Sequence, residues 1–244
     1  MIDRYKHMMH KNIELHFIEG HEYFAKKAFE SLKSSYKKLK EYFELQNDIS
    51  IRVVLAPNRL EFEYIIISKL NVSIEIPSRS SRIAQPNKSQ LVLLSPIAYE
   101  TESSYKYKSE DFERLIFHEL VHMFQDHLIV DSGRFPIWFK EGQAIYLSGQ
   151  WNIEPEFKDS VEKSLSQNKI PTLREINNNV VLSYEWGGVL LKYIDELYGR
   201  EGIVDITKNC THRYIFEYLD WELSDYEIQW KKWVLKVKEE YFKL

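Results

Sequence analysis

Residues 109–127 read SEDFERLIFHELVHMFQDH, and this stretch decides the fold. Ser109 is a suitable N-cap, and the acidic pair Glu110 and Asp111 suits the positive end of a helix dipole. Apolar residues recur at helical spacing along the stretch, at Phe112, Leu115, Ile116, Leu120 and Phe124. The pattern predicts a helix from Ser109 to about His127 with one face packed against a core.

The same helix contains the motif His118-Glu119-Leu120-Val121-His122, which is H-E-x-x-H. Histidines at positions i and i+4 lie one above the other on a helix face, so both imidazoles can bind one zinc ion. A catalytic zinc has three protein ligands and one position for water. The motif therefore predicts a zinc site whose third ligand comes from another segment. The alternative is a pair of histidines that only pack in the core or face solvent.

Glu141 is the candidate third ligand. It follows His122 after a spacer of 18 residues, 123–140, within the mostly apolar segment PIWFKEGQAIY at 136–146. A carboxylate on such a helix is expected to be buried, and burial is costly unless the charge is paired or metal-bound. Gly142 beside it favours a close helix–helix approach. The alternative is a solvent-facing Glu141 next to Lys140.

Composition limits the possible functions. The 244 residues are 44% hydrophobic and 14% aromatic, which suffices for a sizeable core or for two subdomains around a cleft. The 33 basic and 37 acidic residues leave a formal charge of -4, and no long Lys/Arg run is present. A nucleic-acid partner is not expected.

The cysteine count and the N-terminal sequence bear on location. Cys210 is the single cysteine, so an intrachain disulfide and a cysteine-rich metal site are excluded, and we interpret it as a packing residue. The opening stretch MIDRYKHMMHKNIELHF is charged throughout, and no stretch of about 18 apolar residues occurs. We expect a soluble cytoplasmic protein without a membrane partner.

The first third of the chain is expected to be of α/β character. Apolar residues at helical spacing predict a helix over 24–43, and ISIRVVL predicts a strand from Ile49 to Leu55. A short helix is expected from Leu60 to Leu70. The segments NVSIEIP (71–77) and SQLVLLSP (89–96) are expected to be strands separated by a polar turn-prone stretch.

Further helices are predicted over Trp138–Leu147, over Tyr184–Tyr198 with Gly199 as the stop, and over Tyr226–Phe242. The C-terminal aromatics are expected to be core residues rather than a ligand-binding shelf: Tyr214, Phe216, Tyr218, Trp221, Trp230 and Trp233. No internal repeat or flexible linker is evident. We therefore expect one catalytic unit, 1–244, with an α/β subdomain at 1–108 and a helical part at 109–244.

The combination of H-E-L-V-H, an 18-residue spacer and a glutamate within WFKEGQAIY resembles the gluzincin zinc metallopeptidases, and more specifically the compact peptidase MA-like branch of that clan. The resemblance covers about residues 13–200 and is strongest at 112–147. It implies an α+β, zincin-like metallopeptidase fold: a small mixed sheet with an N-terminal helix, a zinc-binding helix and a helical C-terminal subdomain.

By this resemblance His118, His122 and Glu141 hold one zinc ion per chain, and Glu119 is the general base that activates zinc-bound water. The chemistry of the residues asks for the same roles. In this clan a downstream Tyr or His often hydrogen-bonds the oxyanion, and Tyr184 occupies a similar place before a helix. Tyr146 is another candidate, and core packing is the alternative for both tyrosines.

Two departures from better-known clan members narrow the assignment. The zinc aminopeptidases have a G-x-M-E-N type motif upstream, and residues 82–95 read RIAQPNKSQLVLLS instead, which favours an endopeptidase over an aminopeptidase. Ile145 stands where the thermolysin branch has an acidic residue that orients a zinc histidine, so another group must orient it.

The remaining expectations concern substrate and rival functions. A strand at Gln90–Leu94 at the edge of the sheet would bind an extended peptide by β-augmentation, and an ordinary buried strand is the alternative. The other histidines are expected to be non-ligands: His7, His10, His16, His21, His127 and His212.

The partner is expected to be a peptide or protein substrate, with oligomeric state open. The rival functions are an amidase acting on one dedicated substrate, and a zinc-containing binding or regulatory protein without hydrolytic activity.

Overall fold

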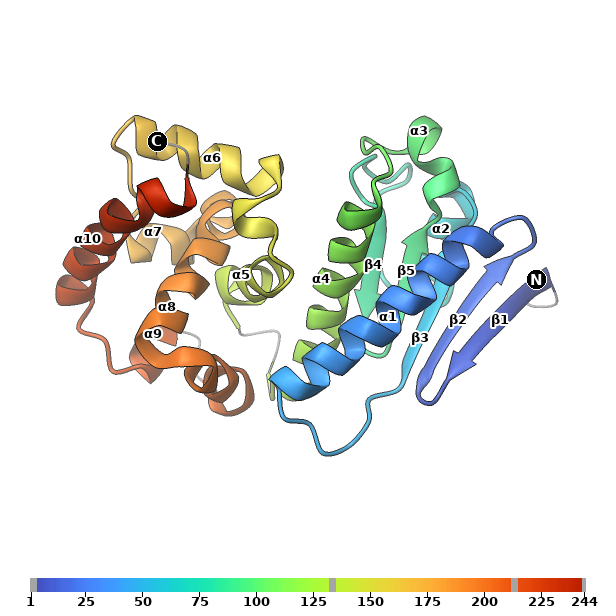
Figure 1. Ribbon diagram of the computed structural model, residues 1–244, viewed down its shortest axis with the longest axis horizontal. Coiled ribbons are helices and arrows are strands. Elements are labelled where there is room, and N and C mark those ends of the chain that lie inside the picture. Colours follow the sequence, from blue (N-terminus) through green and yellow to red (C-terminus); the bar gives the residue numbers. More distant parts are fainter. Residues whose placement is uncertain (1–3, 132–134, 212–214, 243–244) are drawn as a thin grey trace. The chain divides into compact units, whose positions relative to one another are not determined.

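A computed structural model describes residues 4–131, 135–211 and 215–242. The protein is α+β, with a small mixed sheet and many helices, and it divides into two compact units, residues 1–127 and 128–244 (Figure 1). The sequence places the subdomain boundary at 108/109, whereas the compact units divide at 127/128. Among the described residues, none of the helices has the length and apolarity to cross a membrane.

The first unit contains a five-stranded sheet of order β1-β2-β3-β5-β4. Strands β2, β3 and β5 run parallel, and the outer strands β1 and β4 are antiparallel to their neighbours. The strand bounds are Tyr5–His10 (β1), Ile13–Ile18 (β2), Ile51–Ala56 (β3), Ala84–Asn87 (β4) and Gln90–Leu94 (β5).

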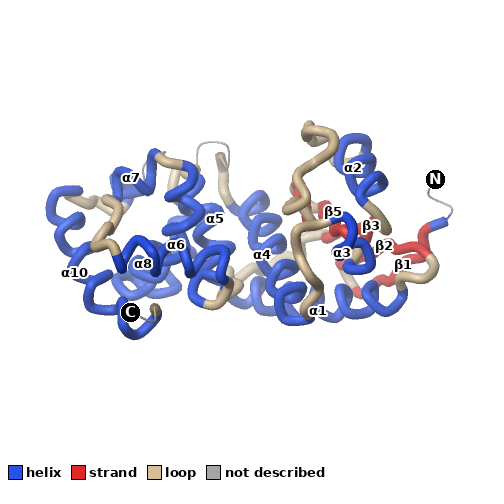
Figure 2. The backbone as a smooth tube through the Cα atoms, turned by 90° about the horizontal axis from the view of Figure 1, so that it is seen from above, coloured by secondary structure: helices blue, strands red, loops and turns tan. Residues whose placement is uncertain are grey.

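Alternation along β3 explains how the sheet is packed. Ile51, Val53 and Leu55 are buried, and Arg52 between them is exposed. Helix α1 (Glu22–Tyr42), which is the predicted N-terminal helix, and helix α2 (Arg59–Ser68) lie on opposite sides of the strands (Figure 2). Helix α2 begins after Asn58, whose side chain accepts a 2.9 Å hydrogen bond from the backbone N–H of Glu61.

Helix α4 (Ser109–Leu128) is the predicted zinc helix, and it packs on α1. Phe124 of α4 contacts the rings of Tyr36 and Phe43, with centroid distances of 5.5 Å and 5.8 Å. Figure 1 shows α1 and α4 near one another within the first unit. This aromatic contact explains why α4 belongs to the sheet-containing unit rather than to the helical one.

Three expectations about strands are corrected. Strand β5, at Gln90–Leu94, pairs on both sides and is therefore not an edge strand; β4 takes that place. β4 lies in the stretch expected to be a turn, and it is joined to β5 by a two-residue turn in which Lys88 has φ 53°. The stretch 71–77 forms no strand. Residues 5–18, for which no strand is predicted, form the hairpin of β1 and β2.

The second unit is helical. The predicted helices appear as α5 (Ile137–Leu147), α8 (Val180–Asn209) and α10 (Leu223–Tyr241). The expected stop at Gly199 is a kink, with φ 65° and ψ -177°, after which α8 continues to Asn209. Helices α6 (Pro155–Ser166), α7 (Leu173–Asn178) and α9 (Ile215–Tyr218) were not predicted. The short elements η2 (Pro96–Ala98), α3 (Tyr99–Glu102) and η3 (Gln150–Asn152) complete the fold.

Large aromatic residues form the core of this unit. Trp138, Trp186 and Trp230 are fully buried, and the rings of Trp186 and Trp230 meet edge to face at 6.1 Å. Phe216 and Trp221 are also buried, which agrees with the expected core role, whereas Tyr218 and Trp233 are only half-buried. Tyr214 lies outside the described residues. Cys210 is buried, in agreement with a packing role.

Helices α5 and α8 cross at two glycines. A Cβ added to Gly142 would lie 2.6 Å from the backbone carbonyl of Gly187, and one added to Gly187 would lie 2.7 Å from the carbonyl oxygen of Trp138. The expected close approach at Gly142 is therefore confirmed. Gln143, beside it, donates a buried 2.9 Å hydrogen bond to Thr207 of α8 and further fixes the crossing.

We predict that Gly142→Ala destabilises the second unit by about 1–3 kcal/mol, because the new methyl group meets backbone rather than a movable side chain. Urea denaturation followed by circular dichroism measures the change. Lys232→Ala, on the exposed face of α10, is the control and should shift stability by less than about 0.5 kcal/mol. Equal stability of Gly142→Ala and wild type would contradict the proposed glycine crossing.

Candidate metal centre

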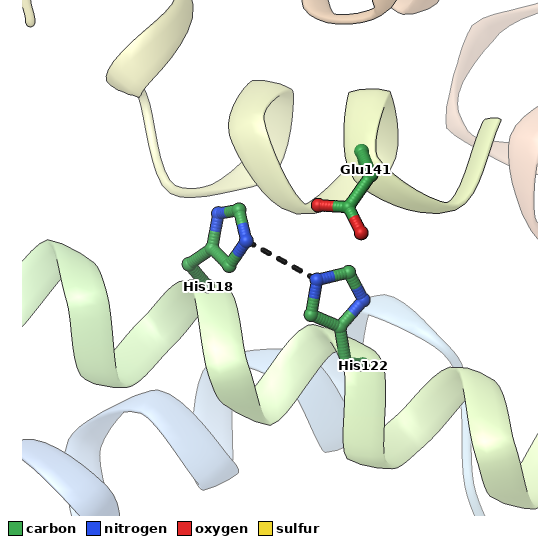
Figure 3. Close-up of side chains that lie close together, drawn as sticks. All are labelled: His118, His122 and Glu141. Carbon is green, nitrogen blue, oxygen red and sulfur yellow. Dashed lines mark hydrogen bonds between the residues drawn. The ribbon is translucent and has the colours of Figure 1, made fainter. Parts of the chain in front are cut away.

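Helix α4 brings two imidazole rings together. The Nε2 atoms of His118 and His122 lie 3.1 Å apart, and the ring centroids are 4.9 Å apart with planes at 78° (Figure 3). Both side chains are half-buried. The i, i+4 spacing produces this arrangement because the two residues share one helix face.

His122 is oriented by a neighbour on the same helix. Its Nδ1 lies 2.9 Å from Oε1 of Gln125, and this oxygen can only accept, so Nδ1 carries the proton in this bond. The neutral ring then has its lone pair on Nε2, the atom that faces His118. Gln125 is fully buried, with 0% of its surface exposed, and the bond to the half-buried His122 is partly shielded from water. Gln125 therefore supplies the orienting group that Ile145 does not.

Glu119 lies between the two histidines in sequence. It is buried, with 8% of its surface exposed, on a helix that otherwise buries mostly apolar side chains. A carboxylate in such surroundings needs compensation by hydrogen bonds or by a nearby positive charge. Its position next to His118 fits the expected role of a base beside a metal.

Glu141 lies on α5, between the buried Trp138 and the crossing at Gly142. Its side chain is half-buried, which lies between the expected burial and the alternative of a solvent-facing carboxylate. His118, His122 and Glu141 each offer one ligand atom, and these atoms lie within 4.8 Å of one another (Figure 3). The three residues selected from the sequence are thus the group that the structure presents.

The geometry and the donor atoms fit zinc. Imidazole nitrogens bind Zn²⁺ at about 2.0–2.1 Å, so two of them in a tetrahedral site lie about 3.3–3.4 Å apart. The separation of 3.1 Å between the Nε2 atoms is close to this value. Two nitrogens and one carboxylate oxygen form a donor set found in catalytic zinc sites.

The tyrosine candidates are placed differently. Tyr184 lies inside α8 rather than before a helix, and 42% of its surface is exposed, so it is not a core residue. Tyr146 donates a 2.6 Å hydrogen bond to Asp195 of α8, which supports a structural role in the α5–α8 crossing.

The other histidines have different surroundings. His21 is buried and its Nδ1 lies 2.8 Å from the hydroxyl oxygen of Ser95, while His16 pairs with Glu14 at 2.9 Å. Burial lowers the pKa of His21. His212 lies outside the described residues.

Comparison with protein-family models finds no match, and comparison with curated proteins finds none either.

Gln125 is a site residue that the sequence did not predict, and the structure explains why an apolar residue stands at position 145. Gln125, three positions after His122, is a polar residue among buried neighbours, and this was the available signal. Ile145 is buried at the α5–α8 crossing, where a Cβ on Gly188 would lie 2.9 Å from its Cγ2 atom. The side chain at position 145 therefore serves the packing between α5 and α8.

We predict that Gln125→Leu weakens zinc binding by about 10–100-fold, because His122 loses the acceptor that fixes its tautomer and ring orientation. Competition with a chromophoric zinc chelator measures the affinity. Gln125→Glu keeps an acceptor and should recover most of the loss, while Gln167→Leu, at an exposed position, is the control. Unchanged affinity in a folded Gln125→Leu variant would contradict an orienting role.

Proposed function

We propose that this protein is a zinc-dependent metallopeptidase of the gluzincin type, with a zincin-like fold. The observation that carries the proposal is the pair of Nε2 atoms 3.1 Å apart within an H-E-x-x-H helix, with the His122 tautomer fixed by Gln125. The resemblance of residues 112–147 to gluzincins and the mixed α+β architecture support it.

In this proposal His118, His122 and Glu141 hold zinc, and their grouping within 4.8 Å supports that role. Zinc, when bound, polarises the scissile carbonyl and lowers the pKa of a water molecule to about 7. Side chains of this chain carry out the proton transfers of the reaction.

Glu119 acts as the general base. Its carboxylate takes a proton from the attacking water and then delivers it to the leaving amine, so that one water is consumed and one amide bond becomes a carboxylate and an amine. Burial of Glu119 supports the role, because a shielded carboxylate acts more strongly on a proton that it shares with the reacting water.

The substrate is a peptide bond, and the reaction is that of an endopeptidase rather than an aminopeptidase. The stretch 82–95 lacks the glutamate-containing motif with which zinc aminopeptidases bind a free amine. Tyr184 is the candidate to stabilise the oxyanion, and its 42% exposure on α8 supports this role over core packing.

We predict that the purified protein contains one zinc per chain and cleaves a quenched mixed-peptide library, and that Glu119→Gln lowers cleavage by about 10²–10⁴-fold. The glutamine keeps the shape of the side chain and removes the base. Elemental analysis and fluorescence measure the two quantities, and zinc should remain bound in the variant. Glu110→Gln, on an exposed position of the same helix, is the control.

The other outcomes decide between the rival functions. One zinc with no cleavage by wild type would support an amidase with a dedicated substrate or a zinc-containing binding protein, and a wide amide screen would separate these. Cleavage retained in Glu119→Gln would contradict the assigned base. No zinc, even after reconstitution, would overturn the proposal.

A further inference from the structure

A cavity lies in the first unit, and it shares no residue with the candidate metal centre. Its volume is about 300 Å³, and it is lined by residues of strands β1, β2, β3 and β5 and of helix α2 and its C-terminal extension. Helix α2 lies over one side of the sheet (Figure 2). A cavity of this size is at the lower end of the range for small-molecule sites.

The sheet side of the cavity has a row of polar residues across three strands. Glu14, Arg52 and Gln90 are direct neighbours on β2, β3 and β5, and all three line the cavity. Both carboxylate oxygens of Glu14 are engaged: Oε2 with Nε of Arg52 at 3.1 Å and Oε1 with Nε2 of His16 at 2.9 Å. Arg52 uses only Nε in this pair, so its terminal amino groups remain as donors.

The helix side contains a second carboxylate that is also engaged. Glu61 of α2, with 9% of its surface exposed, accepts a 2.9 Å hydrogen bond from the hydroxyl of Tyr5 and pairs with Arg4 through its other oxygen. Burial raises the pKa of Tyr5, so its hydroxyl stays protonated and continues to donate. This bond joins β1 to α2.

The two lining carboxylates, Glu14 and Glu61, are matched by the lining cations Arg52 and Lys69, and Arg4, which pairs with Glu61 from outside the lining, adds one positive charge. Each lining carboxylate lies in an ion pair with an arginine, and the ammonium group of Lys69, which also lines the cavity, is an additional cation. Within the described part of the chain, Lys69 has no carboxylate partner. Between these groups the walls are apolar, formed by Val54 of the sheet and by Ile65 and Leu70 on the helix side.

We propose that this cavity binds a small organic anion that combines an apolar body with one carboxylate. The apolar body lies between α2 and the sheet, and the carboxylate accepts hydrogen bonds from Lys69 and the terminal amino groups of Arg52. Because an engineered cavity of about 150 Å³ holds benzene, about 300 Å³ accommodates a phenyl ring with a short alkyl chain. The site is independent of the proposed peptidase chemistry.

Three probes of one shape test the proposal: 4-phenylbutyrate, 4-phenylbutanol and 4-phenylbutylamine. Each is titrated to about 10 mM into full-length protein labelled at Ile, Leu and Val methyl groups, and methyl NMR shifts are followed. We expect 4-phenylbutyrate to shift the methyl signals of Val54, Ile65 and Leu70, and to bind at least about 10-fold more tightly than the amine.

Variants of the lining residues test which contacts contribute to binding of the probes. Lys69→Met should weaken 4-phenylbutyrate binding by about 10-fold and leave the alcohol unchanged, because a charge-assisted hydrogen bond is lost while the apolar contacts remain. Lys27→Met, at an exposed position of α1, is the control and should change nothing. Val54→Phe fills the cavity and should abolish binding of all three probes in a folded protein.

Equal binding of the anion and the amine would overturn the assigned charge preference, and so would an unaffected Lys69→Met variant. Methyl shifts confined to other parts of the chain, or the absence of binding by any probe, would overturn the site itself. None of these results bears on the zinc content or on peptide cleavage, so the two proposals fail separately.

Discussion

The hydrogen bond between Nδ1 of His122 and Oε1 of Gln125 is the interaction on which the candidate site depends. An imidazole can bind a metal through only one nitrogen at a time, and the other must be held if the ring is to keep its direction. Because both residues lie on α4, three positions apart, the helix itself brings their side chains together. The helix in turn is held by Phe124 against α1, so ligand orientation depends on the core of the first unit.

The second unit holds Glu141 in position. This residue is a half-buried acid on the mostly apolar helix α5. Its neighbours leave little freedom: Gly142 lies against the backbone of Gly187, and Gln143 is hydrogen-bonded to Thr207. With no Cβ at the crossing, the helices approach at backbone distance, and a small shift of α5 would meet a steric barrier. A carboxylate on such a helix is held in place by its scaffold, which would reduce the ordering cost in the proposed role of metal ligand.

The features of the candidate site that depend only on neighbouring residues in the sequence could be predicted. The H-E-x-x-H helix, Glu141 and Gly142 each combine a residue type with helical spacing, and the structure places them accordingly. The strands were harder to predict because each strand pairs with a segment that can lie far away in the sequence. Strand β4, AQPN, has no β-branched residue, and only its pairing with β5 makes it a strand. Pro86 within it was a signal of an edge strand, because proline is confined to sheet edges, whereas the apolar run LVLL indicated burial and not an edge.

Energetics also favour a neutral amide over a carboxylate at position 125. Metal-binding histidines are often oriented by carboxylates, but Gln125 is fully buried, where an ionised carboxylate would be costly without a further partner. Two acids, Glu119 and Glu141, already belong to the candidate site, and a third would add like-charge repulsion. Glutamine accepts the same hydrogen bond from His122 without a charge. The helix can therefore present two histidines and one buried base, and the orienting group adds no negative charge to them.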